Sequence, residues 1–579
     1  MDKRTRAFNF ILSSSVVLFL VIILGLKFDY YYDLNDDVLM KDILSGAYSG
    51  ECVSRNIQML YPISLLFSVL YRILPGVAWY GYALCIFQFG ALLIIVNRSL
   101  SFLDGYILKI VTAVSEIAIF MALMLNHLIN VQYTISVAFM AAAAAMWFIT
   151  LKIDGSIVEV ILRALPAILI LVGAFLLRSE MLMLMLPFVL AAIVYTFFNR
   201  EVSKDRIYKV LSIFAAIILP ILLGLGINKL AYSDDGWREF SRLFDARTDL
   251  YDYQIIPEYE GNEAFYDSIG LNREEAYLFE NYNYGLNDKV DSVLMGKVAS
   301  YAKGVKDSDE AFGSKLIRRM RIYIYEISHG KNSTGSDYPY NLVAGVLYIM
   351  IIAIAVGSRK LIDLWCPATL FLGRTLIWMY ILMGDRSPDR ITHSLYFVEI
   401  VVLFGLLYKG LNERKNVERA KILEPMLITL LFIIMAVFIA PDRFYSLNVD
   451  QVKREETNTP FLKLYEYTMQ HPDDLYLFDV YSSVAYSEKM FDKSKEISKE
   501  NTELMGGWFY GSPIEEAKIL KIGDGGMEEA LLNDNVYLIS KADTDMIWLT
   551  DYYESHDKDV ELLLMDSIAS EFNIYELHR

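Results

Sequence analysis

Cysteine is scarce in this chain of 579 residues, which contains only Cys52, Cys85 and Cys366. The last two lie in apolar runs, and no pair has the C-x-x-C spacing of zinc and redox sites. The sequence also lacks the G-x-x-x-x-G-K-S loop that cradles nucleotide phosphates, and the H-E-x-x-H and G-x-S-x-G motifs of two large hydrolase classes. These absences exclude a disulfide framework and argue against ATP-driven transport by this chain.

Positive charge is also in short supply, since 53 Lys and Arg stand against 70 Asp and Glu. The acidic excess is concentrated in two polar stretches. Residues 441–579 carry 13 basic and 29 acidic side chains, and residues 231–339 carry 13 and 20. A protein that binds nucleic acid needs a basic patch, so this distribution argues against nucleic acid as a partner.

Long apolar runs, in contrast, are abundant, and 55% of the residues are hydrophobic. Runs of roughly 18 to 22 apolar residues recur, long enough to cross the roughly 30 Å hydrocarbon core of a bilayer. The candidate segments are 7–26, 57–74, 77–97, 106–126, 131–150, 157–177, 181–198, 208–230, 340–357, 361–382, 391–409 and 423–440. The sequence therefore predicts a mainly α-helical, polytopic protein of the plasma membrane, with the lipid bilayer as a partner.

The short basic loops set the orientation, because Lys and Arg are enriched on the cytoplasmic side. The clearest are the N-terminal MDKRTR and residues 199–209, 358–360 and 409–421. If every segment crossed the membrane, loop 199–209 would lie outside. Segment 57–74 contains Pro62, and we interpret it as a juxtamembrane helix at the outer face. About eleven spans then remain, with the N-terminus in the cytoplasm.

The two acidic stretches are then expected outside the cell. Residues 231–339 are rich in tyrosine and predict short helices and loops over the bundle. Residues 441–579 predict a small extracytoplasmic α/β domain, since four segments have strand patterns: 474–480, 535–540, 560–565 and 572–577. Residues 1–440 would form the transmembrane domain, which includes the outer loop 28–56 and the outer block 231–339.

An acidic pair follows the first apolar run, in the stretch "FDYYYDLNDDVLMKDILSG". Two interpretations fit Asp36 and Asp37. In the first they mark a helix N-terminus, with Asn35 or Asp36 as the N-cap and Gly46 as the stop. In the second, one carboxylate is a general base beside a cavity at the membrane surface, where a neighbouring charge or apolar surroundings raise its pKa.

Four arginines at predicted outer positions are candidate ligands of a lipid phosphate: Arg55, Arg178, Arg386 and Arg390. Arginine outside runs against the usual charge bias, and a phosphate ligand would account for it. Each also has a structural explanation. Arg55 can extend to the membrane interface, Arg386 and Arg390 can pair with nearby acids, and Arg178 can pair with Glu180.

Other polar side chains at predicted outer helix ends are candidates for an acceptor or sugar pocket: His127, Gln132, Glu180 and His393. Amides in the tight turn 125–134 can line such a pocket, although a lone histidine at a helix end is more often a hydrogen-bond partner. Glu116 lies inside a predicted span and is interpreted as facing a polar interior, as a structural group or a proton relay.

The arrangement resembles the GT-C superfamily of membrane glycosyltransferases, which use polyprenyl-phosphate-linked sugars. The resemblance rests on the pair Asp36-Asp37 after the first span, the outer juxtamembrane helix, the many spans and the soluble domain at the C-terminus. It covers most of the chain and concerns the architecture, since the motif itself is short. Where many relatives have a Lys-Pro-Pro-like motif, this chain has "NIQMLYP" at 56–62.

The resemblance implies that Asp36 or Asp37 deprotonates an acceptor hydroxyl, which attacks and inverts the anomeric carbon of a hexose or pentose. Polyprenyl phosphate would leave with its charge held by Arg55, Arg386 or Arg390. The acceptor would be an envelope glycan or lipid at the outer face of a bacterial cell. Some branches use a divalent metal, Mg or Mn, and the sequence does not decide whether this chain needs one.

Three alternatives remain open from the sequence. An envelope polysaccharide polymerase or ligase would depend on arginine and histidine in the outer loops. A transporter or flippase of lipid-linked glycans would need a continuous polar route across the bundle. A non-catalytic scaffold would leave Asp36 and Asp37 facing bulk water, away from the arginines.

Overall fold

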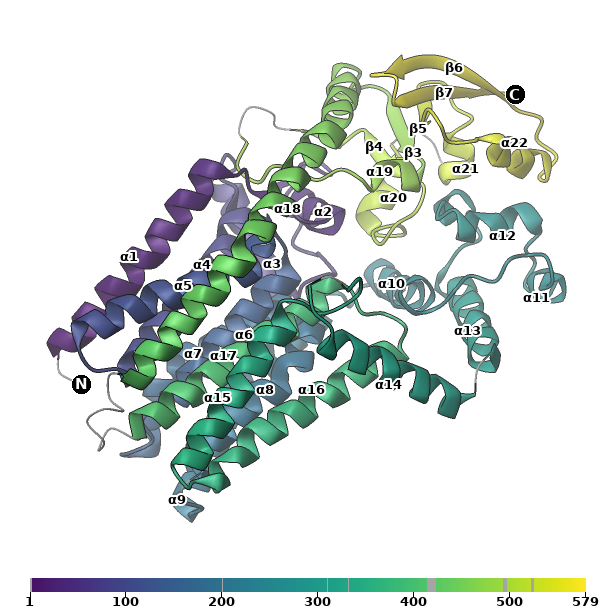
Figure 1. Ribbon diagram of the computed structural model, residues 1–579. Coiled ribbons are helices and arrows are strands. Elements are labelled where there is room, and N and C mark those ends of the chain that lie inside the picture. The colour runs from purple at the N-terminus through teal and green to yellow at the C-terminus, as the bar shows by residue number, and fades with distance from the viewer. Residues whose placement is uncertain are drawn as a thin grey trace.

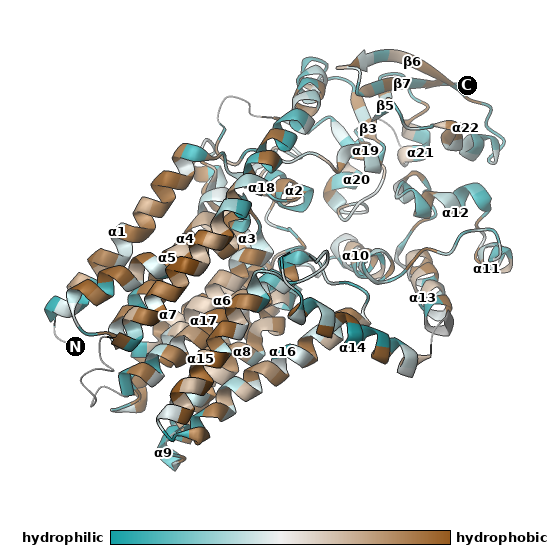
Figure 2. Ribbon diagram, viewed as in Figure 1, coloured by the Kyte–Doolittle hydropathy of each residue, from teal (hydrophilic) through white to brown (hydrophobic). Residues whose placement is uncertain are grey.

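The computed structural model describes residues 3–199, 201–309, 311–331, 333–413, 423–492, 497–521 and 525–579. A bundle of long helices carries the two polar stretches at one end (Figure 1). The bundle helices are mostly hydrophobic, whereas hydrophilic residues are frequent in the polar stretches (Figure 2). Most of the predicted basic loop 409–421 lies outside the described residues.

Among these residues, ten helices are long and apolar enough to cross a membrane. They are α1 (Lys3–Lys27), α4 (Trp79–Ser99, continued by η1, Leu100–Phe102), α5 (Tyr106–Ile129), α7 (Ile157–Leu177), α8 (Ser179–Phe198), α9 (Lys204–Ala231), α15 (Tyr340–Gly357), α16 (Trp365–Met383, preceded by η3, Leu361–Leu364), α17 (Asp389–Glu413) and α18 (Leu423–Gln470). The chain is therefore a multi-pass membrane protein, as the apolar runs predict.

The two remaining apolar segments form shorter helices. Helix α3 (Tyr61–Ile73) has 13 residues, or about 20 Å, which is too short to cross the bilayer. Helix α6 (Tyr133–Ile149) has 17 residues, or about 25 Å. It packs against α4, α7, α8 and α17, and all its residues except Trp147 are buried. With α6 counted as a span, the described residues contain eleven, in line with the prediction of about eleven.

Helix α18 connects the bundle to the C-terminal sheet. It packs on α5 within the bundle and continues to Gln470, so the domain boundary expected at 440/441 lies inside a continuous helix. Figure 1 shows this helix rising out of the bundle toward the strands.

The C-terminal sheet has the order β4-β3-β5-β7-β6, in which β4, β3 and β5 are parallel and β7 runs antiparallel to both its neighbours. Its strands are β3 (Leu475–Phe478), β4 (Thr502–Leu504), β5 (Val536–Lys541), β6 (Glu561–Ile568) and β7 (Phe572–His578). The short helices between them are α19 (Val480–Ser483), α20 (Pro513–Ile519), α21 (Met527–Ala530) and α22 (Ile547–Glu554). The four strands predicted from the sequence are confirmed, and the small α/β domain with them.

The Tyr-rich outer block is helical. Its elements are α10 (Asp235–Tyr253), α11 (Glu263–Ser268), α12 (Arg273–Glu280), η2 (Tyr284–Leu286), α13 (Ser292–Asp309) and α14 (Phe312–Ser328). Helix α10 packs on α13, and α14 packs on α16 at the edge of the bundle. Figure 1 shows α10 to α13 beside the C-terminal sheet.

A buried asparagine joins the outer block to the sheet domain. Asn283 donates to Asp479 Oδ1 (2.8 Å) and accepts from the backbone N–H of Val480 (2.9 Å). The backbone N–H of Gly285 donates to the carbonyl of Met505 (2.9 Å). The Asn283 side chain and one backbone hydrogen bond thus connect the two outer parts, which form one packed unit.

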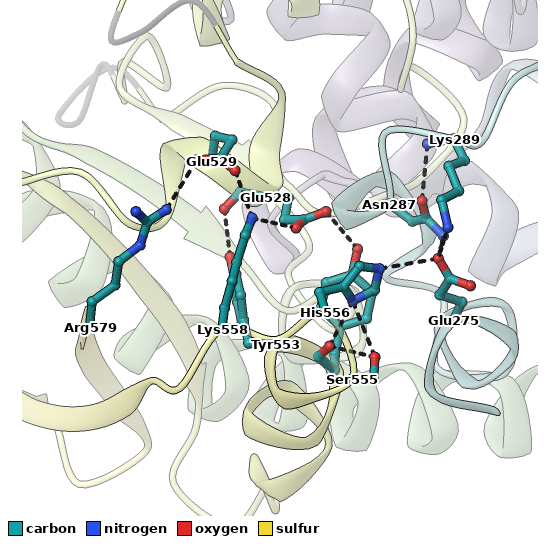
Figure 3. A network of polar contacts seen from close by, with 11 residues as sticks. Glu275, Asn287, Lys289, Glu528, Glu529, Tyr553, Ser555, His556, Lys558 and Arg579 are labelled. Carbon is teal, nitrogen blue, oxygen red and sulfur yellow. Dashed lines mark hydrogen bonds and ion pairs between the residues drawn. The ribbon is translucent and has the colours of Figure 1, made fainter. Parts of the chain in front are cut away.

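A second contact between the outer block and the sheet domain is polar (Figure 3). The carboxylate of Glu275, in α12, contacts Lys289 Nζ at 2.5 Å and His556 Nε2 at 3.2 Å. Lys558 binds both Glu528 and Glu529 within the sheet domain. Burial raises the pKa of Glu275, but the hydrogen bond from Lys289 and the other contacts outweigh this and hold its pKa below the ordinary value.

We expect Gly506→Ala to separate these two outer parts. A Cβ at Gly506 would clash with the carbonyl oxygen of Tyr282, which is backbone and cannot swing away. Thermal unfolding of the purified protein should therefore start several degrees lower, because a forced backbone shift costs about 1–3 kcal/mol. The control is Gly296→Ala in α13, where an added Cβ meets nothing within 4 Å. Equal melting of the two variants would contradict this account of the junction.

Candidate active site

The acidic segment folds into a short strand, a turn and a short helix. Strand β1 (Tyr31–Tyr32) pairs in parallel with β2 (Asn130–Val131), which connects α5 to α6. Helix α2 (Asn35–Ser45) follows, and the predicted stop at Gly46 is confirmed by its left-handed φ of 93°. The predicted N-cap is wrong. Helix α2 starts at Asn35, earlier than either predicted cap requires, so Leu34 occupies the N-cap position without a side-chain cap bond.

A buried ion cluster fixes the far end of α2 to the sheet domain. The carboxylate of Asp42 is fully buried and contacts Lys41 Nζ (2.5 Å) and Lys499 Nζ (2.6 Å). Lys41 also contacts Glu488 at 2.9 Å. Two cations and two anions thus balance, and removing one partner from such a cluster costs about 3–5 kcal/mol. The position of α2 is therefore tightly held.

Asp37 is a buried structural group. Its side chain is inaccessible to solvent, and Oδ1 accepts hydrogen bonds from the Tyr80 hydroxyl (2.7 Å) and the Tyr133 backbone N–H (3.2 Å). Burial raises the pKa of Asp37 well above its ordinary value, the Tyr80 hydrogen bond lowers it, and the charge of Asp36 raises it again. Through these two hydrogen bonds, the Asp37 carboxyl ties α2 to α4 and α6.

The raised pKa predicts a pH-dependent effect of Asp37→Asn. The folded pKa exceeds the unfolded value of about 3.9, so the stability of the wild type falls as the pH rises above about 4 toward the folded pKa. Asparagine keeps the acceptor oxygen and has no proton to lose. The melting temperature of the variant, relative to that of the wild type, should therefore rise as the pH increases from about 4 toward the folded pKa. A difference that stays constant from about pH 4 to about pH 8 would contradict the prediction.

Asp36, in contrast, is partly exposed and opens onto a cavity of about 370 Å³. We call this the outer cavity. Its walls come from α2, α10, the outer end of α18 and sheet-domain residues between Phe478 and Tyr510. Within the described part of the chain, no hydrogen bond or ion pair holds the Asp36 carboxylate. It is therefore available to a ligand.

A second cavity, of about 380 Å³, lies where α5, α15, α17 and α18 reach the end of the bundle that carries the polar stretches. We call it the bundle-end cavity. Arg390 and Arg443 line it, and neither has an ion-pair partner among the residues that the structure describes. Three acids also line it, of which Asp33 and Asp450 are already paired with Arg454.

A third cavity, of about 220 Å³, lies between these two and is bordered by Asp33, Leu34 and Asn35. It shares Asp33 with the bundle-end cavity and Asn35 with the outer cavity. Burial raises the pKa of Asp33 above its ordinary value, while Arg454 and, more weakly, Arg390 lower it. The segment 33–36 therefore borders all three cavities, and the charge of Arg390 acts on it.

Arg178 lies close to the acidic segment. Its guanidinium donates to Gln58 Oε1 (2.6 Å), contacts Glu180 at 3.2 Å and lies over the Tyr133 ring. Burial lowers the pKa of Arg178, but Tyr133, Glu180 and then Asp36 raise it above the ordinary value. Its charge is thus already partly neutralised by Glu180, the pairing that the sequence left open.

The predicted arginines Arg55 and Arg386 line neither the outer cavity nor the bundle-end cavity. Arg55 pairs with Asp234 at 3.3 Å and lies over the Trp237 ring. Arg386 pairs with Asp252 at 2.5 Å. Both are held by carboxylates, which the structural interpretation anticipated for Arg386 but not for Arg55.

The predicted sugar-pocket residues are divided between sites. His127 and His393 face each other, with Nε2 and Nδ1 2.9 Å apart, and both line the bundle-end cavity with Arg390. Gln132 is buried before α6, and its Oε1 has no hydrogen-bond partner in the described structure. The carboxylate of Glu180 is largely exposed beside Arg178.

Within the described ranges, no group of three or more His, Cys, Asp or Glu side chains is arranged to hold a metal ion. Two arginines are functional candidates that sequence reasoning missed. Arg443 follows the span 423–440 at a predicted outer end, so the charge-bias criterion that selected Arg386 would also have found it. Arg247 lies in the outer cavity through long-range contacts that have no signal in the sequence.

Comparisons with known proteins give few matches. No model of a known protein family matches the chain, and a search of curated proteins finds no similar sequence. Among solved structures, the chain is similar to the crystal structure of ArnT from Cupriavidus metallidurans bound to undecaprenyl phosphate. The TM-score is 0.40 at 10% sequence identity, and the alignment covers 98% of this chain and 97% of that chain. At this level of similarity, function has to be argued from the site itself.

Proposed function

We propose that the chain is an integral membrane glycosyltransferase of the GT-C type. It transfers a sugar from a polyprenyl-phosphate donor to an envelope glycan or lipid at the outer face, with inversion at the anomeric carbon. One observation carries the proposal: Asp36 and Arg390, which have no ion pair among the described residues, lie in separate cavities that meet at segment 33–36.

The bundle-end cavity suits the donor. It lies at the outer ends of spanning helices, where the phosphate of a lipid whose tail is in the bilayer would reach it. Arg390 and Arg443 offer guanidinium forks that match phosphate oxygens. Arg178, His127 and His393 lie nearby. Arg55 and Arg386, which are held by carboxylates, are weaker candidates.

The outer cavity suits the acceptor. Asp36 accepts the proton of an acceptor hydroxyl, whose oxygen attacks the anomeric carbon from the side opposite the phosphate. A new C–O bond forms, the bond from the anomeric carbon to the phosphate oxygen breaks, and polyprenyl phosphate leaves with the electron pair. Phosphate is a good leaving group, so one carboxylate and a cationic phosphate site suffice, whereas hydrolytic glycosidases use two carboxylates. Asp37 holds α2 in place and takes no part in proton transfer.

The proposed orientation places the N-terminus in the cytoplasm and the sheet domain outside, with the domain division of the sequence analysis. A deletion of the gene in its host tests the function. We expect loss of one envelope glycan modification and accumulation of a polyprenyl-phosphate sugar on the outer leaflet. If the protein were a flippase, its deletion would instead leave that lipid on the inner leaflet. Accumulation on the inner leaflet, or an unchanged glycan profile, would therefore contradict the proposal.

A further inference from the structure

The outer cavity has a wall of aromatic rings. Tyr282, Tyr465, Tyr481, Trp508 and Tyr510 are among the residues that line it. Its volume of about 370 Å³ lies within the range of small-molecule sites. Aromatic faces carry partial negative charge and stack on the C–H face of a pyranose ring, while tyrosine hydroxyls bond to sugar hydroxyls. The wall therefore has the chemistry of a carbohydrate site.

One arginine in this wall has an incomplete set of partners. Arg247 is largely buried, and its Nε has no hydrogen-bond partner in the described structure. Its ion-pair contact is with Asp252 Oδ1 at 4.0 Å, and the same carboxylate binds Arg386 at 2.5 Å through Oδ2. One carboxylate thus serves two guanidinium groups, which leaves positive charge beside the cavity.

The other ionised side chains of the cavity wall are balanced, apart from Asp36. Lys499 belongs to the buried cluster around Asp42, and Glu503 pairs with Lys518 at 2.9 Å. Among the ionised groups of this wall in the described structure, Asp36 has no ion pair and Arg247 shares its counter-ion with Arg386. The first can accept a proton from a hydroxyl, and the second can bind an anion.

The local backbone holds this arrangement in place. Tyr282 has a φ of 68°, a left-handed conformation that is uncommon for residues other than glycine. Its ring lies 5.3 Å from the Arg247 guanidinium carbon and 4.1 Å from the Tyr251 ring. The guanidinium thus lies against two aromatic rings that contact each other, and this restraint lowers the entropy lost when it binds a planar anionic group.

From these contacts we infer that the outer cavity binds a saccharide carrying an acidic group, a carboxylate or a phosphate, which Arg247 recognises. The inference rests on the proposed function, in which this cavity holds the acceptor. Arg247 is then the residue that sets acceptor specificity, while Asp36 faces the reacting hydroxyl.

Binding to the full-length protein in nanodiscs tests this inference without any turnover. Three probes are compared: methyl glucoside, methyl glucuronide, and methyl glucoside phosphorylated on its primary hydroxyl. Dissociation constants come from the fluorescence of the tryptophans, which include Trp508 in the cavity wall, or from ligand-observed NMR. We expect at least one acidic probe to bind about 10-fold more tightly than the neutral one, because a charge-assisted pair contributes at least about 1.4 kcal/mol.

Arg247→Gln should remove this preference. The dissociation constant of the neutral glucoside should stay within about twofold of wild type, which is less than the tenfold difference expected between the probes. The control is Arg242→Gln, an exposed arginine on the same helix that pairs with Glu239, which should keep the preference. If only one of the two acidic probes is preferred, that probe shows whether Arg247 recognises a carboxylate or a phosphate. Equal binding of all three probes, absence of binding, or a preference that survives Arg247→Gln would overturn the inference.

The two proposals fail in different ways. If transfer depends on Asp36 but Arg247→Gln leaves the probe preference intact, the glycosyltransferase proposal stands and the acidic-saccharide inference falls. If the probe preference depends on Arg247 while Asp36→Asn transfers sugar at the wild-type rate, the base assignment falls and the binding site stands.

Discussion

Asp36→Asn is expected to slow sugar transfer by about 100-fold or more, the usual contribution of a positioned general base. Asp37→Asn should retain most of the wild-type rate. The difference follows from burial: Asp36 opens onto the outer cavity, whereas Asp37 is buried with its Oδ1 bonded to Tyr80 and Tyr133. The measurement is the initial rate of transfer by each purified variant, at equal amounts of folded protein.

A matched pair of variants separates the chemical role from a structural one. Asp36→Glu keeps a carboxylate and should restore part of the activity lost in Asp36→Asn, although the longer side chain shifts its position. Asp37→Ala removes the oxygen Oδ1 that accepts from both Tyr80 and Tyr133 and should lower the melting temperature, since each buried donor left unpaired costs about 1–3 kcal/mol. Loss of transfer in Asp37→Asn with a normal melting temperature would reverse the assignment of the two carboxylates.

Arg390→Gln is expected to raise the KM for the lipid-linked donor by about 10- to 100-fold, because a charge-assisted bond to phosphate contributes about 1.5–3 kcal/mol. No ion pair neutralises Arg390 among the described residues, so its charge is available to the ligand. The KM for the acceptor should change little, since Arg390 does not line the outer cavity. Steady-state kinetics with each substrate varied in turn separate the two constants.

The control for this variant is Arg321→Gln, in the exposed arginine-rich part of α14, which should leave both KM values unchanged. Arg443→Gln should weaken donor binding in the same direction as Arg390→Gln. An unchanged donor KM in both Arg390→Gln and Arg443→Gln would show that the lipid phosphate binds elsewhere, and Arg178 would then be the next arginine to test.

The spans were predictable because a segment that crosses a bilayer must be both long and apolar. The count of crossings between the basic loops, together with Pro62, also made α3 recognisable as a helix that does not cross. The strands β3, β5, β6 and β7 have strong apolar patterns. Strand β4 was missed because three residues, Thr502–Leu504, are too few to show a period.

The candidate site was only partly predictable. The charge bias against outer arginines pointed to Arg390, but it could not distinguish Arg390 from Arg386, whose partner Asp252 lies far away in the sequence. Likewise, adjacent carboxylates on one helix gave no reason to bury Asp37 and expose Asp36. That choice depends on Tyr80 and Tyr133, which approach α2 only in the folded bundle.

The most direct test of the central claim is transfer by the purified protein in proteoliposomes. The donors are polyprenyl-phosphate sugars, radiolabelled in the sugar and extracted from the host, and the acceptor is host envelope material. The proposed mechanism predicts that wild-type protein moves label to the acceptor and releases unlabelled polyprenyl phosphate in equal amount, and that Asp36→Asn does neither at a comparable rate. Label that stays on the lipid with wild-type protein, or equal transfer by Asp36→Asn, would contradict it.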